Sequence, residues 1–125
     1  MTNINGSKSI LVVDDSPVTR MLMRKLLEKE EFIVAEADNG GSAVSHLESN
    51  PVSLIFMDIE MPGKNGYETT RVIRDKSLTK APIIALTSHA DEESRTQSKL
   101  SGMTGSTTKP IQSDKILKIL RRHLS

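Results

Sequence analysis

An apolar run that ends in two adjacent carboxylates occupies residues 10–17, which read Ile10-Leu11-Val12-Val13-Asp14-Asp15-Ser16-Pro17. A continuous apolar run of this kind is typical of a parallel strand buried on both faces of its sheet. Ser16 followed by Pro17 is typical of a helix start, with serine as the N-cap and proline in the first turn. The stretch therefore predicts a buried strand that turns directly into a helix, with two acidic side chains at the turn.

Short apolar runs recur along the chain, and polar stretches of helical character separate them. The expected strands are Ile10–Val13, Phe32–Ala35, Val52–Met57, Ile83–Leu86 and the polar segment Gly105–Lys109, which suits a sheet edge. The first expected helix begins at Pro17. The other four cover Gly41–Ser49, Gly66–Asp75, Asp91–Leu100 and Ser113–Leu124. Strands that alternate with helices in this way predict a doubly wound α/β fold, with an open parallel sheet covered by helices on both faces.

The expected first helix has one apolar face, and two further apolar residues lie outside or at the edge of that face. Four residues at helical spacing are expected to face inward: Leu22, Met23, Leu26 and Leu27. Met21 falls outside this face and Val18 lies at its edge, so the two could form a small apolar patch for a partner.

The composition restricts the class of protein. A chain of 125 residues with 36% hydrophobic and 26% charged residues is typical of one soluble globular domain. The chain has no cysteine, which excludes disulfides and thiolate metal sites. Its net charge of +1 gives no general reason to expect a nucleic acid or membrane partner, and no apolar run approaches the ~20 residues that cross a bilayer. We expect a cytoplasmic protein with a flexible N-terminal arm at residues 1–7 and one domain at residues 8–125.

Polar residues follow the ends of the expected strands. Asp14 and Asp15 follow the first run, Asp58 the third, Thr87 the fourth and Lys109 the last. In an open parallel sheet the carboxyl ends of the strands share one edge, where ligands bind at the point at which strand order reverses. The sequence thus predicts a crevice that holds three carboxylates, a hydroxyl and an ammonium group.

This set of side chains favours phosphoryl chemistry with a hard metal ion. Three close carboxylates repel one another unless a cation compensates them, and an all-oxygen ligand set suits Mg²⁺. A carboxylate can act as a nucleophile towards phosphorus, and a lysine is a suitable partner for a phosphoryl oxygen. Asp58 is the best candidate nucleophile, because it stands alone at a strand end before an irregular loop, whereas Asp14 and Asp15 resemble a metal-holding pair.

With these residues and their spacing, the chain resembles a response-regulator receiver domain, the phosphoacceptor module of two-component signalling. The motifs that carry the resemblance are ILVVDDSP at residues 10–17, EADNG at Glu36–Gly40, MDIEMPGKNGYE at Met57–Glu68, IIALTSHA at residues 83–90 and TTKP at Thr107–Pro110. The resemblance implies a flavodoxin-like (βα)5 fold with strand order 2-1-3-4-5. The segment from Met57 to Arg74 is most similar to receivers of hybrid kinases and phosphorelays.

The resemblance also implies a ligand set for the metal. Asp15 and Asp58 would bind Mg²⁺ directly, the backbone carbonyl of Glu60 would be a third ligand, and Asp14 would act mainly through water. Mn²⁺ is expected to substitute for Mg²⁺.

On the phosphoryl side, the resemblance implies that Asp58 is the phosphoacceptor. Thr87 would be the hydroxyl that moves to the phosphoryl group, and Lys109 would pair with that group. The bond between Lys109 and Pro110 is expected to be cis. His89 lies two residues after Thr87, and with Glu60 it could control the access of water to an acyl phosphate.

The implied partners are a sensor histidine kinase or a histidine phosphotransfer protein, which would donate the phosphoryl group, and an unknown downstream protein. The fold accounts for the chain, so the signal is expected to leave through protein–protein contacts. The domain is expected to catalyse only its own phosphorylation and dephosphorylation and not to be an enzyme in the usual sense.

Two alternatives remain open from the residues. A Mg²⁺-dependent phosphohydrolase with an aspartate nucleophile shares the chemistry, although the haloacid-dehalogenase type needs an Asp-x-Asp pattern and a cap over the site. A binding-only pseudo-receiver is the second, but the acidic residues and the lysine that it would lack are all present. A partial version stays open because of Ser106, in which the domain is phosphorylated but uses the phosphoryl group for relay instead of a switch.

One position departs from the family pattern. Receivers usually carry an aromatic residue three positions before the lysine, whereas this chain has Ser106 there, preceded by Thr104 and Gly105 in place of the usual acidic pair. The only tyrosine, Tyr67, lies elsewhere and cannot substitute. The usual threonine–aromatic response is therefore expected to be absent or altered. A nearby basic run, Lys115, Lys118, Arg121 and Arg122, is interpreted as the solvated face of the last helix.

Overall fold

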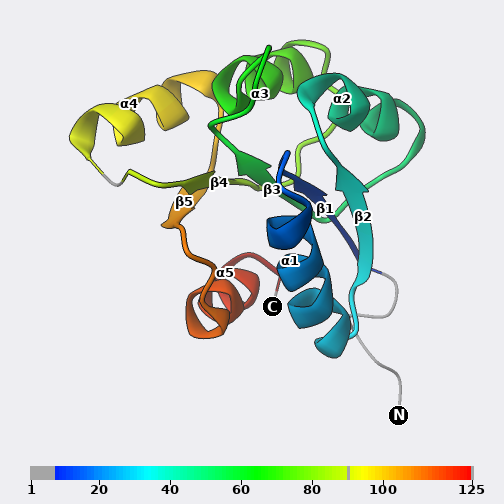
Figure 1. Ribbon diagram of the computed structural model, residues 1–125. Coiled ribbons are helices and arrows are strands. Elements are labelled where there is room, and N and C mark those ends of the chain that lie inside the picture. Colours follow the sequence, from blue (N-terminus) through cyan, green and yellow to red (C-terminus); the bar gives the residue numbers. More distant parts are fainter. Residues whose placement is uncertain (1–7, 90, 125) are drawn as a thin grey trace.

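The computed structural model describes residues 8–89 and 91–124 and shows a parallel sheet between two layers of helices (Figure 1). Helices α1 and α5 cover one face of the sheet, and α2, α3 and α4 cover the other. The expected flexible arm at residues 1–7 and the last residue of the expected domain lie outside the described residues. No helix in the described ranges is long and apolar enough to span a membrane.

Five strands and five helices alternate along the described chain, as the sequence predicts. The elements are β1 (Ser9–Val13), α1 (Pro17–Lys29), β2 (Ile33–Ala37), α2 (Gly40–Ser49), β3 (Leu54–Asp58), α3 (Gly66–Asp75), β4 (Ile83–Thr87), α4 (Glu92–Ser101), β5 (Gly105–Thr108) and α5 (Ser113–Leu124). All neighbouring strands pair in parallel in the order β2-β1-β3-β4-β5. The predicted doubly wound fold and strand order are confirmed.

Alternate residues of the central strands form two cores, one on each face of the sheet. On β1, Ile10 and Val12 pack with the core beneath α1 and α5, whereas Leu11 and Val13 pack with the core beneath α2 and α3. All four side chains are fully buried, and burying a side chain of this size stabilises a fold by roughly 1.5–3 kcal/mol. The continuous apolar run of β1 therefore reflects burial on both faces.

Helix α1 begins as predicted, but its inward face is narrower than predicted. Ser16 is the N-cap, its side chain accepts a hydrogen bond from the Thr19 backbone N–H, and Pro17 occupies the first turn. Met23 and Leu27 are buried, whereas Leu22 is 47% exposed, so the prediction that Leu22 faces inward is wrong. Leu22 is one residue from Met23, which turns it by about 100° on a helix of 3.6 residues per turn and away from the sheet.

Several element boundaries also differ from the predicted ones. β2 runs to Ala37 instead of ending at Ala35, because Glu36 continues this edge strand with its carboxylate paired to Arg20 and Arg24 on α1. Helix α4 begins at Glu92, with Asp91 as its N-cap, and ends at Ser101, which is followed by the C-cap Gly102, whose φ of 103° is left-handed. β3 begins at Leu54 instead of Val52.

Candidate functional site

The register of the sheet brings the predicted polar residues to one edge. Val13, the last residue of β1, lies opposite Met57 on β3, so Asp14 and Asp58 are neighbours at the ends of adjacent strands. Thr87 ends β4 opposite Thr108 on β5, and Lys109 follows at once. Carboxylate oxygens of Asp14, Asp15 and Asp58 lie within 4.8 Å of one another. The predicted positions of these residues at the carboxyl edge of the sheet are confirmed.

Lys109 joins two of the carboxylates. Its Nζ lies 3.0 Å from Asp14 Oδ2 and 3.3 Å from Asp58 Oδ1. Burial lowers the pKa of the Lys109 ammonium, but the hydrogen bonds and charges of Asp14 and Asp58 outweigh burial and raise this pKa above its ordinary value. Lys109 therefore stays charged in this crevice. The peptide bond between Lys109 and Pro110 is cis, as expected.

Asp58 is a buried carboxylate with one oxygen unused. The residue is 1% exposed, and its Oδ1 accepts a hydrogen bond of 3.1 Å from the Glu60 backbone N–H. Its Oδ2 is buried and has no hydrogen-bond partner among the described residues. Burial, reinforced by the negative charge of Asp14, raises the pKa of Asp58 to about 6. A buried polar atom without a partner is costly, so this oxygen is placed to accept a ligand.

Asp14 and Asp15 are adjacent in sequence but differ in environment. Asp14 is fully buried, and its Oδ1 accepts a hydrogen bond of 2.8 Å from the Ser16 backbone N–H. Asp15 is exposed and contributes its carboxylate to the group from the solvent side. One aspartate is thus fixed by the turn and by Lys109, and the other is free to approach an ion from outside.

The oxygen-only set at this edge fits a hard divalent cation. Asp14, Asp15 and Asp58 supply carboxylates, and the unpartnered Asp58 Oδ2 is an open coordination position. Mg²⁺ is commonly bound by one or two carboxylates and completes its shell with water or phosphate. Within the described residues, no other group of three or more His, Cys, Asp or Glu side chains could hold a metal.

Thr87 contributes a buried hydroxyl that is already engaged elsewhere. Its Oγ1 donates a hydrogen bond of 2.8 Å to the His89 carbonyl and accepts one of 3.0 Å from the His89 backbone N–H. The hydroxyl therefore holds the start of the β4–α4 loop in this structure. To donate its hydrogen to a group on Asp58, the hydroxyl has to release the bond that it donates to the His89 carbonyl.

The side chains of Glu60 and His89 lie near each other, two residues after Asp58 and two residues after Thr87. His89 Nε2 is 3.9 Å from Glu60 Oε1, and both side chains are exposed. The proximity of the two side chains agrees with their expected position beside the site. Their control of water access stays a prediction.

Two positioning residues were not identified from the sequence. Arg20 donates from Nη1 to the Asp14 carbonyl at 2.8 Å and from Nε to Glu36 at 3.0 Å, so it fixes the backbone at the end of β1. Gly66 starts α3 so close to the strand that a Cβ atom there would lie 2.4 Å from the Asp58 carbonyl oxygen. The Asn65–Gly66 pair was a visible sign of a turn, but the close approach depends on tertiary packing.

The sequence profile of the response regulator receiver domain matches residues 10–121. The chain belongs to this family. Protein PilH of Pseudomonas aeruginosa is 33% identical over 93% of this chain and 97% of its own length. The transcriptional regulatory protein ResD of Bacillus subtilis is 42% identical over 89% of the chain, and the sensor histidine kinase GacS of Pseudomonas protegens is 35% identical over the same share. The chain spans 45% of ResD and 12% of GacS.

Solved receiver structures agree with the fold. The receiver domain of the sensor histidine kinase PA1611 from Pseudomonas aeruginosa, solved with a magnesium ion in its active site cleft, is 32% identical and has a TM-score of 0.84 over 93% of this chain and 96% of that one. Membership of the receiver family favours a signalling domain over the phosphohydrolase alternative.

Proposed function

We propose that this receiver domain accepts a phosphoryl group on Asp58 from a phosphohistidine, with Mg²⁺ bound beside it. The donor would be a sensor histidine kinase or a histidine phosphotransfer protein. The observation that carries the proposal is the state of the Asp58 carboxylate, which is buried, unpartnered at Oδ2 and next to the Lys109 ammonium. The setting would be the cytoplasm, and the domain would catalyse only its own phosphorylation and dephosphorylation.

The transfer forms an O–P bond to an Asp58 carboxylate oxygen and breaks the P–N bond of the donor. The electron pair of the broken bond remains on the imidazole nitrogen of the donor histidine, which takes up a proton from water. Asp58 must be ionised to attack, and its raised pKa of about 6 leaves it ionised above neutrality. Burial removes competing water from the carboxylate, which favours attack by Asp58 over hydrolysis of the donor.

Mg²⁺ would be held by Asp14, Asp15 and Asp58, with the Glu60 backbone carbonyl as a further oxygen ligand. When bound, the ion supplies positive charge that offsets the carboxylates and the phosphoryl oxygens. Manganese should substitute, since its preference for oxygen ligands is similar.

Lys109 is the residue best placed to stabilise the transferred group. Its Nζ now pairs with Asp14 and Asp58, and it can exchange the second contact for a phosphoryl oxygen without a large movement. A fixed positive charge in a buried site stabilises a transition state more strongly than it would in water.

Thr87 would report on the phosphoryl group. To donate its hydroxyl to a phosphoryl oxygen, Thr87 must release the bond that it donates to the His89 carbonyl. The loop before α4 would then lose one of the two bonds that hold His89, and the phosphorylated state would favour a different loop conformation.

The kinase or phosphotransfer protein would dock beside the crevice on α1. Val18, Met21 and Leu22 are exposed apolar side chains on this helix, which begins immediately after the acidic turn. Because α1 follows the acidic turn directly, a partner that covers this patch could present a phosphohistidine to Asp58. The patch predicted from Val18 and Met21 therefore gains a third member, Leu22.

Intact-protein mass spectrometry after incubation with acetyl phosphate tests the proposal. We expect the mass to increase by one phosphoryl group with Mg²⁺, and we expect no increase with EDTA or in Asp58→Asn. Asp15→Asn should also lower the yield, while a matched exposed carboxylate, Asp38→Asn, should leave it unchanged.

Two results would contradict the proposal. An adduct that persists in Asp58→Asn would place the phosphoryl group elsewhere. The absence of both an adduct and steady phosphate release with Mg²⁺ would leave the binding-only pseudo-receiver as the better description.

A further inference from the structure

A hollow of about 370 Å³ lies beside the loop that joins α3 to β4. Because β4 begins at Ile83, this loop is at the amino-terminal edge of the sheet, and the acidic crevice is at the carboxyl edge. The residues that line the hollow are Arg74, Ser77, Thr79 and Lys80. The lining thus has two cations, two hydroxyl groups and no carboxylate, which is the reverse of the charge in the crevice.

Arg74 carries a positive charge that no carboxylate offsets within the described residues. Its Nε donates to the Gly102 carbonyl at 3.1 Å. Its Nη1 donates to the Thr79 carbonyl at 2.9 Å, and its Nη2 donates to the Ala81 carbonyl at 2.8 Å. All three acceptors are neutral, and neither Asp75 nor any other described carboxylate forms an ion pair with Arg74. Burial lowers the pKa of the Arg74 guanidinium, as expected for a charge without an opposite partner.

The two cations of the hollow still have hydrogen-bond donors to offer. Nη1 and Nη2 of Arg74 each carry a second N–H group, and no acceptor for it exists among the described residues. The Arg74 side chain is held in place, because a Cβ atom on Gly102 would lie 2.8 Å from its Cγ. Lys80 is exposed, and its ammonium group has no hydrogen-bond or ion-pair partner in the described ranges. The hollow therefore combines a fixed guanidinium with an adaptable ammonium group.

Ser77 adopts a backbone conformation that favours glycine. Its φ of 53° lies in the left-handed region, and it directly follows Lys76, the C-cap of α3. Glycine is the usual residue at this place after a helix, since it adopts the conformation without steric cost. Residues in such conformations occur preferentially at functional sites. What serine adds over glycine is a hydroxymethyl group in the lining of the hollow.

The hydroxyl groups of the lining can also donate. Thr79 Oγ1 accepts a hydrogen bond of 3.0 Å from the Ala81 backbone N–H, which leaves its own hydrogen without an acceptor among the described residues. The Ser77 hydroxyl has no partner in the same part of the chain. The carbonyls of residues 72–74, at the end of α3, already accept hydrogen bonds from the backbone N–H groups of residues 76–78. These carbonyls therefore do not present unpaired acceptors to a bound anion.

We propose that this hollow binds a phosphate-type oxyanion, as free phosphate or as the phosphate group of a small monoester. Arg74 and Lys80 supply the opposite charge, and the hydroxyls of Ser77 and Thr79 donate to the oxygens of the anion. A hollow of about 370 Å³ also has room for the organic part of a monoester. No residue of the crevice takes part, so the inference does not rest on the proposed phosphoryl transfer to Asp58.

Backbone amide NMR spectra of the full chain, recorded during titration with inorganic phosphate, test the inference. The titration is made in EDTA, so that no divalent cation draws phosphate to the three carboxylates of the crevice. We expect saturable shifts of the amide signals of residues 74–80, and none with sodium chloride at equal ionic strength. Glucose 6-phosphate, compared with glucose, separates the two sources of the group. Tighter binding of the ester than of phosphate would assign the hollow to a monoester, and the reverse would assign it to the free ion.

A pair of lysine variants separates the site from net charge. Lys80→Met removes one cation of the lining and should weaken phosphate binding by about fivefold. Lys76→Met removes the same charge from an exposed neighbouring position that does not line the hollow. At physiological salt its effect should be less than about twofold, because screening weakens charges that make no contact.

Ser77→Gly separates binding from folding, because it removes the hydroxyl and the backbone strain together. We expect it to weaken phosphate binding by about threefold and, at the same time, to raise the midpoint of urea unfolding. Opposite changes in affinity and stability are not expected of a residue with a purely structural role.

Any of three results would overturn the inference. They are the absence of a saturable shift at residues 74–80 with both phosphate and glucose 6-phosphate, an equal loss of affinity in Lys80→Met and Lys76→Met, and native affinity in Ser77→Gly. None of these results bears on whether Asp58 is phosphorylated.

Discussion

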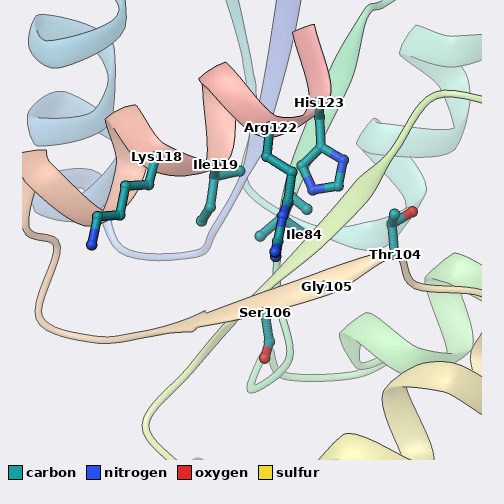
Figure 2. A pocket seen from close by; sticks show the side chains of 8 residues that line it. All are labelled: Ile84, Thr104, Gly105, Ser106, Lys118, Ile119, Arg122 and His123. Atoms are coloured by element: carbon teal, nitrogen blue, oxygen red, sulfur yellow. The ribbon is translucent and has the colours of Figure 1, made fainter. Parts of the chain in front are cut away.

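The acidic crevice lies at the carboxyl end of β5, and a hollow lined by Ser106, Lys118 and Arg122, the β5–α5 trough, lies between the same short strand and α5 (Figure 2). The two regions differ in how their charged side chains are paired. At the carboxyl end of β5, Lys109 is partly buried and contacts two carboxylates at 3.0 and 3.3 Å. Along the strand, Lys118 and Arg122 of α5 are exposed and have no acidic partner among the described residues. Opposite charges fixed in a buried site suit chemistry, whereas unpaired charges on an open surface suit recognition.

This contrast agrees with how the chain relates to its family. The residues to which the resemblance assigns phosphoryl transfer gather at the crevice, and the departure from the family pattern falls at Ser106 in the trough. The contrast predicts that the crevice behaves as an ordinary receiver site and that the trough behaves independently of it. Four changes to the protein or its conditions test this description, and the two largest expected effects come first.

Removal of the crevice lysine should have the largest effect. Lys109→Met should slow phosphorylation by acetyl phosphate by roughly 100-fold, because a preorganised charge is lost at a buried site. The rate is measured from the mass of the intact protein over time. Lys118→Met removes the same charge from the trough and should change the rate by less than about twofold. An equal loss of phosphorylation rate in the two variants would mean that the crevice and the trough do not differ in the way we describe.

The pH dependence of stability should be an effect of similar size in free energy. Burial raises the pKa of Asp58 to about 6, whereas an unfolded aspartate titrates near 4. The folded state therefore holds this proton more tightly, and its contribution to the free energy of unfolding is complete below pH ~4 and is lost as the pH rises through 6. A difference of about two pKa units corresponds to about 3 kcal/mol.

Urea unfolding in EDTA measures this contribution. Relative to the native protein, Asp58→Asn should gain up to about 3 kcal/mol between pH ~4 and ~7, and Mg²⁺ should reduce that gain. Lys118→Met should show no such gain. A difference between Asp58→Asn and native protein that does not change with pH would mean that the Asp58 carboxylate is not under the strain that we describe.

Removal of the Thr87 hydroxyl should have a smaller effect. Thr87→Ala should lower the free energy of unfolding by about 1 kcal/mol, since a buried hydroxyl loses its two bonds to His89. Thr87→Ser keeps the hydroxyl and should recover most of the loss. If Thr87→Ser and Thr87→Ala lower the free energy of unfolding equally, the effect comes from the lost methyl group and not from the hydrogen bonds.

A large side chain in the trough should have the smallest effect on the crevice. Ser106→Tyr should leave the rate and yield of Asp58 phosphorylation within about twofold of native, because among the described residues no hydrogen bond or ion pair joins Ser106 to the side chains of Asp58, Thr87 or Lys109. The acetyl phosphate assay measures both. A large change in either would mean that Ser106 belongs to the phosphorylation site.

Much of this arrangement could be predicted from the sequence because it follows from parallel strands that end at one edge. The apolar runs located β1, β3 and β4, and the residues after them gave Asp14, Asp58 and Thr87. The edge strand β2 was placed less well, because Glu36 interrupts its apolar pattern and is compensated only in the folded chain by Arg20 and Arg24.

The pairing within the site was not predictable in the same way. The position of Lys109 between Asp14 and Asp58 depends on the register of β5 against β4, and the engagement of Thr87 with His89 depends on the loop conformation. The basic run on α5 was interpreted as a solvated face. Two of its members, Lys118 and Arg122, line the trough, which is visible only when α5 is placed against β5.

The most direct test of the central claim is to locate the phosphoryl group after reaction with acetyl phosphate and Mg²⁺. Reduction of an acyl phosphate by borohydride converts the modified aspartate to homoserine, which peptide sequencing by mass spectrometry can assign to one position. We predict homoserine at position 58 alone. Homoserine at position 14 or 15, or a phosphoryl group that resists reduction on another type of side chain, would contradict the assignment of Asp58 as the phosphoacceptor.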